Sequence, residues 1–249
     1  MLRMIFGEEP RKDEGLLKDA MNAMDKYLVY VRQEIAKDGD PNHRYRQLEI
    51  WTVGLKTSLD ELEQSLYVAD RFADRVTKAY QAEMSENELD DYYRHVYFYK
   101  NGFIRVFSIL DKVGNVVDDA LFLETEKIKQ RFSFFTVLRN MQHKKVAQGL
   151  FNRLAVIKEE YRLPLQHLRK RRNTEIHHMN TEMQDDLWQR HRSLKEKLKL
   201  ENIDEHMEDL RQGFVAVCRI LVEIFAYLER ERAVRPKPKR HVTRRRKST

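Results

Sequence analysis

A basic segment between residues 168 and 178 contains the side chains that could act together on a phosphate group. Arg172 is followed at once by the polar Asn173, and four residues separate Arg172 from His177 while five separate it from His178. A guanidinium contacts two phosphate oxygens at once, and an imidazole exchanges protons near neutral pH. RNA can be cut by such groups without a metal, because its own 2′-hydroxyl is the nucleophile. The segment therefore predicts that a histidine transfers protons and that Arg172 stabilises the phosphate charge. Asn173 is expected to hold the histidine or the phosphate by a hydrogen bond.

Spacing alone does not single out this segment. Arg162 and His167 have the same spacing, and Arg235 and His241 have a similar one. The residue after the arginine is a leucine in the first pair and a proline in the second, and neither supplies a polar side chain. Only the Arg172 segment combines the spacing with a polar second position. The competing interpretation is a solvated basic face of a helix with two incidental histidines.

Helical geometry complicates the use of one chain for both groups. On a straight helix Arg172 and His177 lie about 140° apart around the axis, so their side chains do not converge. Asn173 and His177 share a face, and so do Arg171 and His178. Either the segment is not a straight helix, or two chains each supply one of the working groups. Spacing leaves open which of the two arginines and which of the two histidines are used.

Composition favours a helix-rich globular chain. Of the 249 residues 41% are hydrophobic and 35% are charged, and glycine and proline are scarce. The apolar start of the chain is too short for a signal peptide, and the longest apolar stretch, 214–228, is interrupted by Arg219 and Glu223. These features predict an all-α, cytoplasmic protein with no membrane segment. The single cysteine, Cys218, is expected to pack as a small hydrophobic residue.

The positive charge is concentrated at the end of the chain. The net charge is +7, but eight basic residues and no acidic ones follow Ala233, so the rest of the chain is close to neutral. The segment 233–249 cannot bury a core and is expected to be disordered. Both it and the segment around Arg172 are expected to bind nucleic acid. The residues expected to do so are Arg169, Lys170, Arg171, Arg244, Arg245, Arg246 and Lys247.

Apolar residues at helical spacing predict three helices in the first half of the chain. The first covers 13–37, and the second, over 48–80, keeps a period of about 3.5 residues that needs a long partner groove, in a bundle or between subunits. Ser85 and Glu88 have the spacing of a capping box, in which the Ser85 hydroxyl and the Glu88 carboxylate each accept from the other's backbone N–H. The third helix starts there, and its aromatic residues predict that it is the central one.

The second half predicts shorter elements. A helical turn is expected over 132–141 and a third bundle helix over 143–161. Pro164 is suited to the first position of the following segment, which contains the Arg172 motif on or near a helix end. A charged, partly helical excursion is expected over 180–202, and Asn202 is expected to cap the last helix.

The run from Tyr97 to Lys112, together with the Arg172 motif, resembles the HEPN superfamily, and in particular a bacterial subfamily of it. The motif of that superfamily is an arginine, a polar residue and then a histidine after four to six intervening positions. The resemblance implies an all-α four-helix bundle that acts as a metal-independent endoribonuclease on RNA. It also implies a homodimer whose two motifs line a shared cleft, a toxin or defence setting, and an antitoxin or regulatory protein as a further partner.

On this basis the chain is divided into an accessory helix at 1–40, a HEPN-like antiparallel bundle at 41–232 and a basic tail at 233–249. We expect no cofactor and no metal, because a glycine-rich phosphate loop and the spacing of a zinc site are both missing from the sequence. His167 could be recruited as a metal ligand, but an isolated histidine on a helix is usually structural or solvated. Two alternatives remain open. One is a catalytically silent RNA-binding HEPN protein, and the other is a helical scaffold that dimerises through its long helices.

Overall fold

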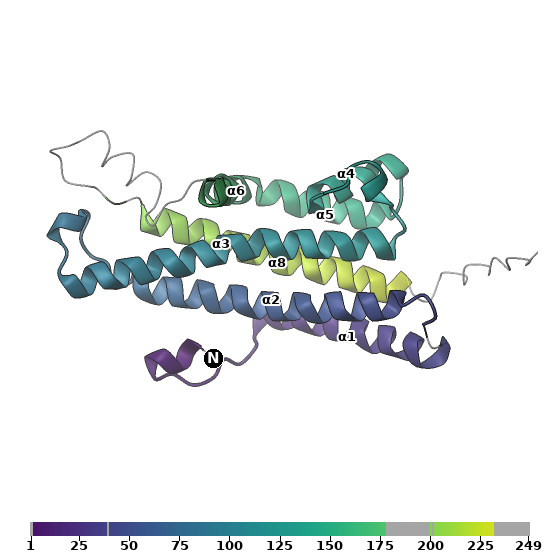
Figure 1. Ribbon diagram of the computed structural model, residues 1–249, viewed down its shortest axis with the longest axis horizontal. Coiled ribbons are helices and arrows are strands. Elements are labelled where there is room, and N and C mark those ends of the chain that lie inside the picture. The colour runs from purple at the N-terminus through teal and green to yellow at the C-terminus, as the bar shows by residue number, and fades with distance from the viewer. Residues whose placement is uncertain (1, 39, 178–199, 201, 232–249) are drawn as a thin grey trace, which may run out of the picture.

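The computed structural model describes residues 2–38, 40–177, 200 and 202–231, and these residues form helices and no strands (Figure 1). The all-α fold class predicted from the sequence is confirmed. The α-helices are α1 (Gly15–Asp38), α2 (Arg44–Ala73), α3 (Glu86–Ala120), α4 (Phe134–Lys144), α5 (Gln148–Glu160), α6 (Arg162–His177) and α8 (Ile203–Glu231). Short 3-10 turns occur at Leu2–Phe6, Gln81–Glu83 and Thr125–Lys127.

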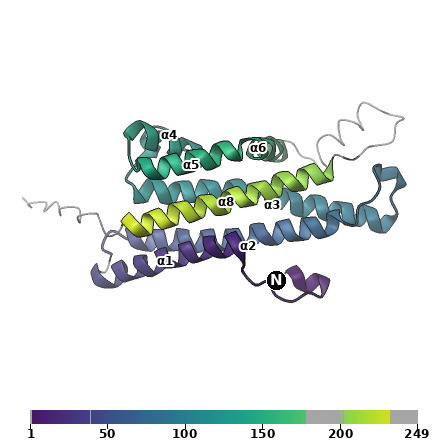
Figure 2. The same ribbon diagram turned by 180° about the vertical axis from the view of Figure 1, so that it is seen from behind.

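The four long helices α1, α2, α3 and α8 lie side by side along the molecule (Figures 1 and 2). α2 packs along α3, and α1 packs against both α8 and α2. The three shorter helices α4, α5 and α6 form a further layer over α3 and α8. Met24 and Val31 of α1 are fully buried in the same core cluster as the residues of α3 and α8. The division of the chain at residues 40 and 232 stays a prediction.

α3 is the central helix, as its aromatic pattern predicts. It contacts α2, α8, α4 and α6, and Tyr99, Phe103 and Ile109 are almost completely buried. Burying an aromatic side chain of this size removes a large apolar area from water, so these residues of α3 contribute strongly to the core.

α2 ends earlier than its apolar period predicts. The helix stops at Ala73, although the pattern continues to residue 80. The carboxylate of Glu88 accepts from the backbone N–H groups of Thr77 (2.6 Å) and Lys78 (2.9 Å), and these bonds stabilise a turn in place of a further helical turn. The bond from Thr77 is also the main reason why the pKa of Glu88 lies below its ordinary value.

The capping box is therefore only half formed. The Ser85 hydroxyl accepts from the backbone N–H of Glu88 at 3.3 Å, as expected, and it caps α3. The reciprocal bond from Glu88 is replaced by the contacts to the preceding turn, so this part of the prediction is wrong.

The prediction of one helix over 143–161 is also wrong. Lys145 and Ala147 both have a φ of +52°, which ends α4 and delays the start of α5 to Gln148. α6 begins at Arg162, so Pro164 is its third residue and not its first. A proline is tolerated there because the first-turn N–H groups of a helix have no acceptor within the helix. Asn202 does cap α8, with its side-chain oxygen 3.2 Å from the backbone N–H of Glu205. The excursion expected over 180–202 lies almost entirely outside the described residues.

α6 packs on the bundle through Leu168. This side chain is fully buried, and a methyl group added at Gly213 of α8 would lie 2.6 Å from its Cδ1 atom and 3.5 Å from Val106 of α3. A glycine at this position thus provides the space in which Leu168 sits between α3 and α8.

We expect Leu168→Ala to lower the free energy of unfolding by about 2–4 kcal/mol, since a buried leucine is removed and a cavity is left. Leu163→Ala on the same helix is the matched control, because Leu163 is 56% exposed and should cost less than about 0.5 kcal/mol. Urea unfolding of both variants measures the difference. Equal stabilities would show that α6 is not held by this contact.

Candidate functional site

The segment predicted to carry chemistry is helical throughout its described length. Residues 168–177 all belong to α6, which lies across the bundle and is seen nearly end-on in Figure 1. His177 is the last residue of the helix, and its side chain lies outside the described part of the structure. His178 lies wholly outside that part. On this helix Arg172 and His177 start about 140° apart around the axis. α6 of one chain therefore does not direct the two side chains to the same side.

Arg172 lies on the side of α6 that faces α3. Its Nη2 and Nε atoms donate to the side-chain oxygen of Asn173 at 2.8 and 3.3 Å, and its guanidinium carbon is 4.9 Å from the ring centre of Phe107. The predicted Arg–Asn pair is thus in direct contact, with the amide fixing the guanidinium plane.

A second arginine shares this side of α6. The guanidinium carbon of Arg169 lies 4.7 Å from the ring centre of Phe135. Burial lowers the pKa of Arg169, the nearby Arg172 lowers it further, and the charge of Asp111 opposes both. Burial likewise raises the pKa of Asp111, although the backbone N–H of Phe134 (3.4 Å) and the two arginines act in the opposite direction. Asp111 was not among the predicted site residues. The sequence signal for Asp111 is that polar residues recur in an otherwise aromatic and aliphatic helix.

Arg171 lies on the other side of α6, which faces α8. Its Nη1 atom donates to Oδ2 of Asp209 at 2.6 Å. Both carboxylate oxygens of Asp209 also lie 3.2 Å from Nδ1 of His167. The structure therefore separates two arginines that spacing leaves equivalent: Arg172 contacts an amide and an aromatic ring, and Arg171 contacts a carboxylate. Neither Asp209 nor this use of His167 was predicted.

An ion pair ties the end of α6 to α3. Nζ of Lys100 lies 2.8 Å from the carboxylate of Glu175, and both side chains are mostly shielded from water. Together with the Arg171–Asp209 pair it fixes the rotation of the last two turns of α6 about the helix axis. Lys170, which lies between Arg169 and Arg171 in the sequence, is exposed.

Beneath this helix, three aromatic side chains form a buried stack. The ring of Tyr99 lies between His95 at 5.9 Å and His206 at 5.6 Å, with interplanar angles of 15° and 12°. Nδ1 of His95 lies 2.9 Å from the backbone oxygen of Ala69. Burial, followed by the charge of Arg171 and the two other histidines nearby, lowers the pKa of His206 to about 3. Burial lowers the pKa of His95 as well. The stack was not predicted, since isolated histidines in apolar patterns carry no distinctive signal.

A family model described as Cthe2314-like HEPN matches residues 51–229, which run from α2 to α8 and include the whole of α6. The chain belongs to the HEPN family. No curated protein and no solved structure matches it. The HEPN match covers the central helix and the Arg172 motif on which the resemblance in the sequence rests.

Within the described part of this HEPN chain, no group of three or more histidine, cysteine, aspartate or glutamate side chains could hold a metal ion. A search of the same residues finds no helix with the length and apolar character of a membrane span. Cys218 is buried in α8, and burial raises its pKa to about 12, so it packs as predicted.

We expect His206 to make folding depend on pH. Its pKa is about 3 in the folded chain and near its ordinary value of about 6.5 in the unfolded chain. The unfolded state therefore gains a proton first, and stability that is complete above about pH 6.5 is lost as the pH falls toward about 3. Between about pH 6.5 and about pH 5 the free energy of unfolding should fall by up to about 2 kcal/mol from this residue.

His206→Phe keeps an aromatic ring in the stack and should make this pH dependence shallower. Urea unfolding at the two pH values measures it, with His143→Phe, at an exposed position of α4, as the control. If His206→Phe keeps the pH dependence of the original chain, the assignment is wrong.

Proposed function

We propose that this HEPN protein is a metal-independent endoribonuclease that acts as a homodimer. The observation that supports the proposal is that Arg172, in the last two turns of the basic helix α6, donates to the side-chain oxygen of Asn173. In this proposal Arg172 stabilises the charge on the phosphorane, and His177 transfers protons to and from the reacting oxygens. Asn173 orients Arg172.

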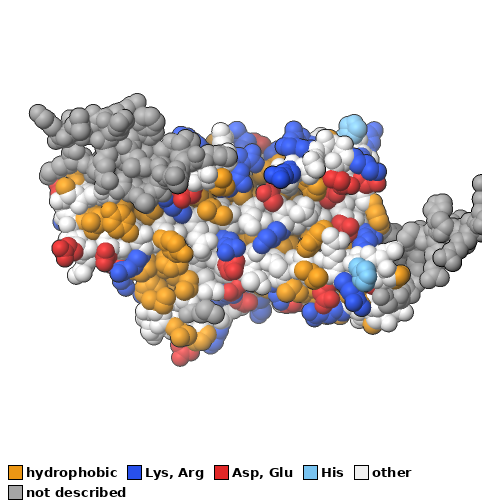
Figure 3. Space-filling model, viewed as in Figure 1, with side chains coloured by type: hydrophobic (Ala, Val, Ile, Leu, Met, Phe, Trp, Pro, Cys, Tyr) orange, Lys and Arg blue, Asp and Glu red, His pale blue; other side chains and the backbone are white. Residues whose placement is uncertain are grey.

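A dimer would resolve the angular separation of Arg172 and His177. If each site takes the arginine from one chain and the histidine from its partner, the two residues need not converge on one helix. An exposed apolar row next to the motif supports a protein interface. It consists of Tyr93, Tyr97 and Ile104, which share one face of α3, with Ile176 at the end of α6. Tyr97 is 65% exposed, and Figure 3 shows hydrophobic side chains grouped over the N-terminal half of α3.

The basic residues would supply the affinity for RNA. Arg169 and Lys170 flank the motif on α6, and Arg244, Arg245, Arg246 and Lys247 lie outside the described residues. Contacts of this kind are mainly to phosphates and therefore weaken with salt. A cytoplasmic location, a toxin or defence role, and control by an antitoxin or regulatory protein belong to the same proposal.

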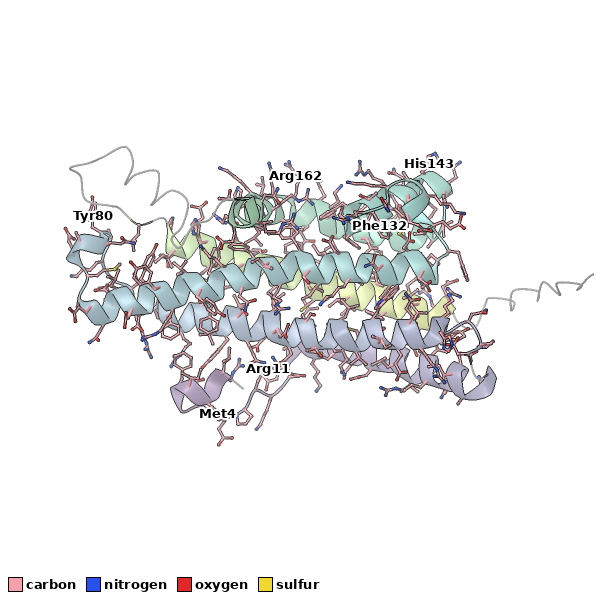
Figure 4. The ribbon with its side chains drawn as sticks, in the orientation of Figure 1. Met4, Arg11, Tyr80, Phe132, His143 and Arg162 are labelled. Atoms are coloured by element: carbon pink, nitrogen blue, oxygen red, sulfur yellow. The ribbon has the colours of Figure 1, made fainter. Side chains whose placement is uncertain are left out.

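The direct test is cleavage of labelled RNA by the purified protein in EDTA. His177→Ala should reduce the single-turnover rate at least about a hundredfold, because general acid–base catalysis contributes roughly 10²–10⁴ in rate. His143→Ala is the matched control, since this exposed residue of α4 lies at the end of the short-helix layer, away from Arg162 (Figure 4). A loss below about tenfold in His177→Ala would remove His177 from the mechanism. RNA binding without any cleavage would favour a catalytically silent HEPN protein.

Mixed dimers test the sharing of the site. Arg172→Ala and His177→Ala dimers should each lose the activity of the shared site, but in a heterodimer one of the two shared sites contains neither substitution. Random reassortment makes about half of the dimers mixed, so about a quarter of the original activity should return. The two variants are unfolded together and refolded, and heterodimers are confirmed by mass before RNA cleavage is measured. Heterodimers that form and stay inactive would show that both residues act within one chain.

A further inference from the structure

The side of α6 that faces α8 carries a separate arrangement of groups suited to phosphate chemistry. His167 and Lys170 are three residues apart and therefore lie on neighbouring positions of the helix surface. Asp209 of α8 lies beneath them, with its carboxylate 3.2 Å from Nδ1 of His167 and 2.6 Å from Nη1 of Arg171. The Asp209 side chain is 10% exposed and that of His167 is 44% exposed, so a shielded carboxylate supports an accessible imidazole.

This contact sets the chemical character of His167. A carboxylate only accepts hydrogen bonds, so the proton of the neutral imidazole is held on Nδ1, next to Asp209. The basic lone pair is then on Nε2, at the opposite edge of the ring. A histidine oriented in this way by a carboxylate serves as a general base in hydrolytic enzymes. Arg171 holds the same carboxylate from a second direction and fixes its position.

The surrounding charges favour an anionic ligand. Arg171 and Asp209 are paired with each other. His206 of α8 is uncharged at neutral pH because its pKa is about 3, and beyond it lie Tyr99 and His95 of α3. Lys170 is exposed, and no ion pair involves it within the described part of the chain. The exposed ammonium of Lys170 is thus left unneutralised three residues along the helix from His167.

We propose that His167 and Lys170 form a second phosphodiester site, complete within one chain, at which His167 is the proton-transfer residue and Lys170 binds the phosphate. Asp209 is the positioning residue of His167, and Arg171 fixes Asp209. The substrate class is RNA, as in the proposed function, but none of Arg172, Asn173 and His177 takes part.

The reaction at this site is the transesterification of RNA. Nε2 of His167 takes the proton of the 2′-hydroxyl, the 2′-oxygen forms a bond to phosphorus, and the bond from phosphorus to the 5′-oxygen breaks. The leaving oxygen takes a proton from water, and His167 returns its proton to solvent, so that protons balance. The products are a 2′,3′-cyclic phosphate and a 5′-hydroxyl end.

The test measures single-turnover cleavage of a labelled RNA in EDTA from about pH 5 to about pH 9. It compares the original protein with His167→Gln, Asp209→Asn, His177→Ala and the double variant His167→Gln/His177→Ala. Glu160→Gln is the matched control, because it removes another ion pair that α8 makes with the short-helix layer, Arg219–Glu160 at 2.6 Å. Thermal unfolding confirms that each variant is folded.

We expect His167→Gln to lower the rate at least about tenfold in the His177→Ala background, where the shared site is inactive. Asp209→Asn should lower the rate in the same background, because an amide does not hold the Nδ1 proton of His167 as a carboxylate does. A further variant, Asp209→Glu, keeps the carboxylate and should restore part of the rate, which a purely structural role of Asp209 would not produce. Glu160→Gln should leave the rate unchanged.

The outcomes separate this inference from the proposed function. Loss of cleavage in His167→Gln with full activity in His177→Ala supports the inference and contradicts the proposed role of His177. Equal rates in His177→Ala and in the double variant overturn the inference and leave the proposed function intact. If Asp209→Asn does not fold, the comparison of His177→Ala with the double variant decides, since His167 is accessible and its replacement leaves the core intact. An original protein that cleaves no RNA overturns both.

Discussion

The insertion of Leu168 between α3 and α8 is the contact on which the functional arrangement of this HEPN chain depends. A glycine at position 213 makes room for it, because a Cβ atom there would lie 2.6 Å from Cδ1 of Leu168 and the leucine side chain would have to shift. α6 has one other buried apolar side chain, Leu165, and much of its sequence is charged. Two buried leucines thus determine where a strongly basic helix crosses the bundle, and its charged residues determine how that helix is rotated.

The rotation follows from two ion pairs that the last turns of α6 make with two different helices. Lys100 holds Glu175 from α3, and Asp209 holds Arg171 from α8. Because successive residues of a helix are turned by about 100°, neighbouring arginines face different helices and different chemical environments. This is why adjacent positions with the same side chain are not interchangeable. The fold uses Arg171 for attachment and leaves Arg172 on the side lined by Phe107.

Much of the fold could be predicted from the sequence, because apolar spacing reports directly on which helix faces are buried. The all-α class and the central position of α3 were predicted in this way, the cap at Asn202 from the side chain that precedes the last helix, and the HEPN family from a resemblance in the central helix and the Arg172 motif. The end of α2 could not be predicted, because its apolar period continues past Ala73 and the competing bonds come from Glu88 in the next helix. The break before α5 rests on two left-handed residues, neither of them a glycine.

The candidate site was predictable only in part. The segment with Arg172 and Asn173 could be identified, since a short motif is local and the two residues contact each other. Asp209 is 38 residues away from Arg171 along the chain, so no local pattern connects it with His167 or Arg171. The catalytic roles of Arg172, Asn173, His177 and His178, and the RNA-binding roles of the basic residues of α6 and of the tail, remain predictions.

The partners of Arg172 have a further electrostatic consequence. An amide oxygen and an aromatic face orient the guanidinium, but neither carries a formal charge, so the field of the cation is not cancelled at short range. Burial raises the pKa of the nearby Asp111 of α3, and Arg172 acts in the opposite direction. Phe107 excludes water from one side of the Arg172 guanidinium, so less water has to be removed from this group when an anion approaches. The helix thereby holds a positive charge that is fixed in direction before any ligand arrives, whereas Arg171 would first have to give up its carboxylate.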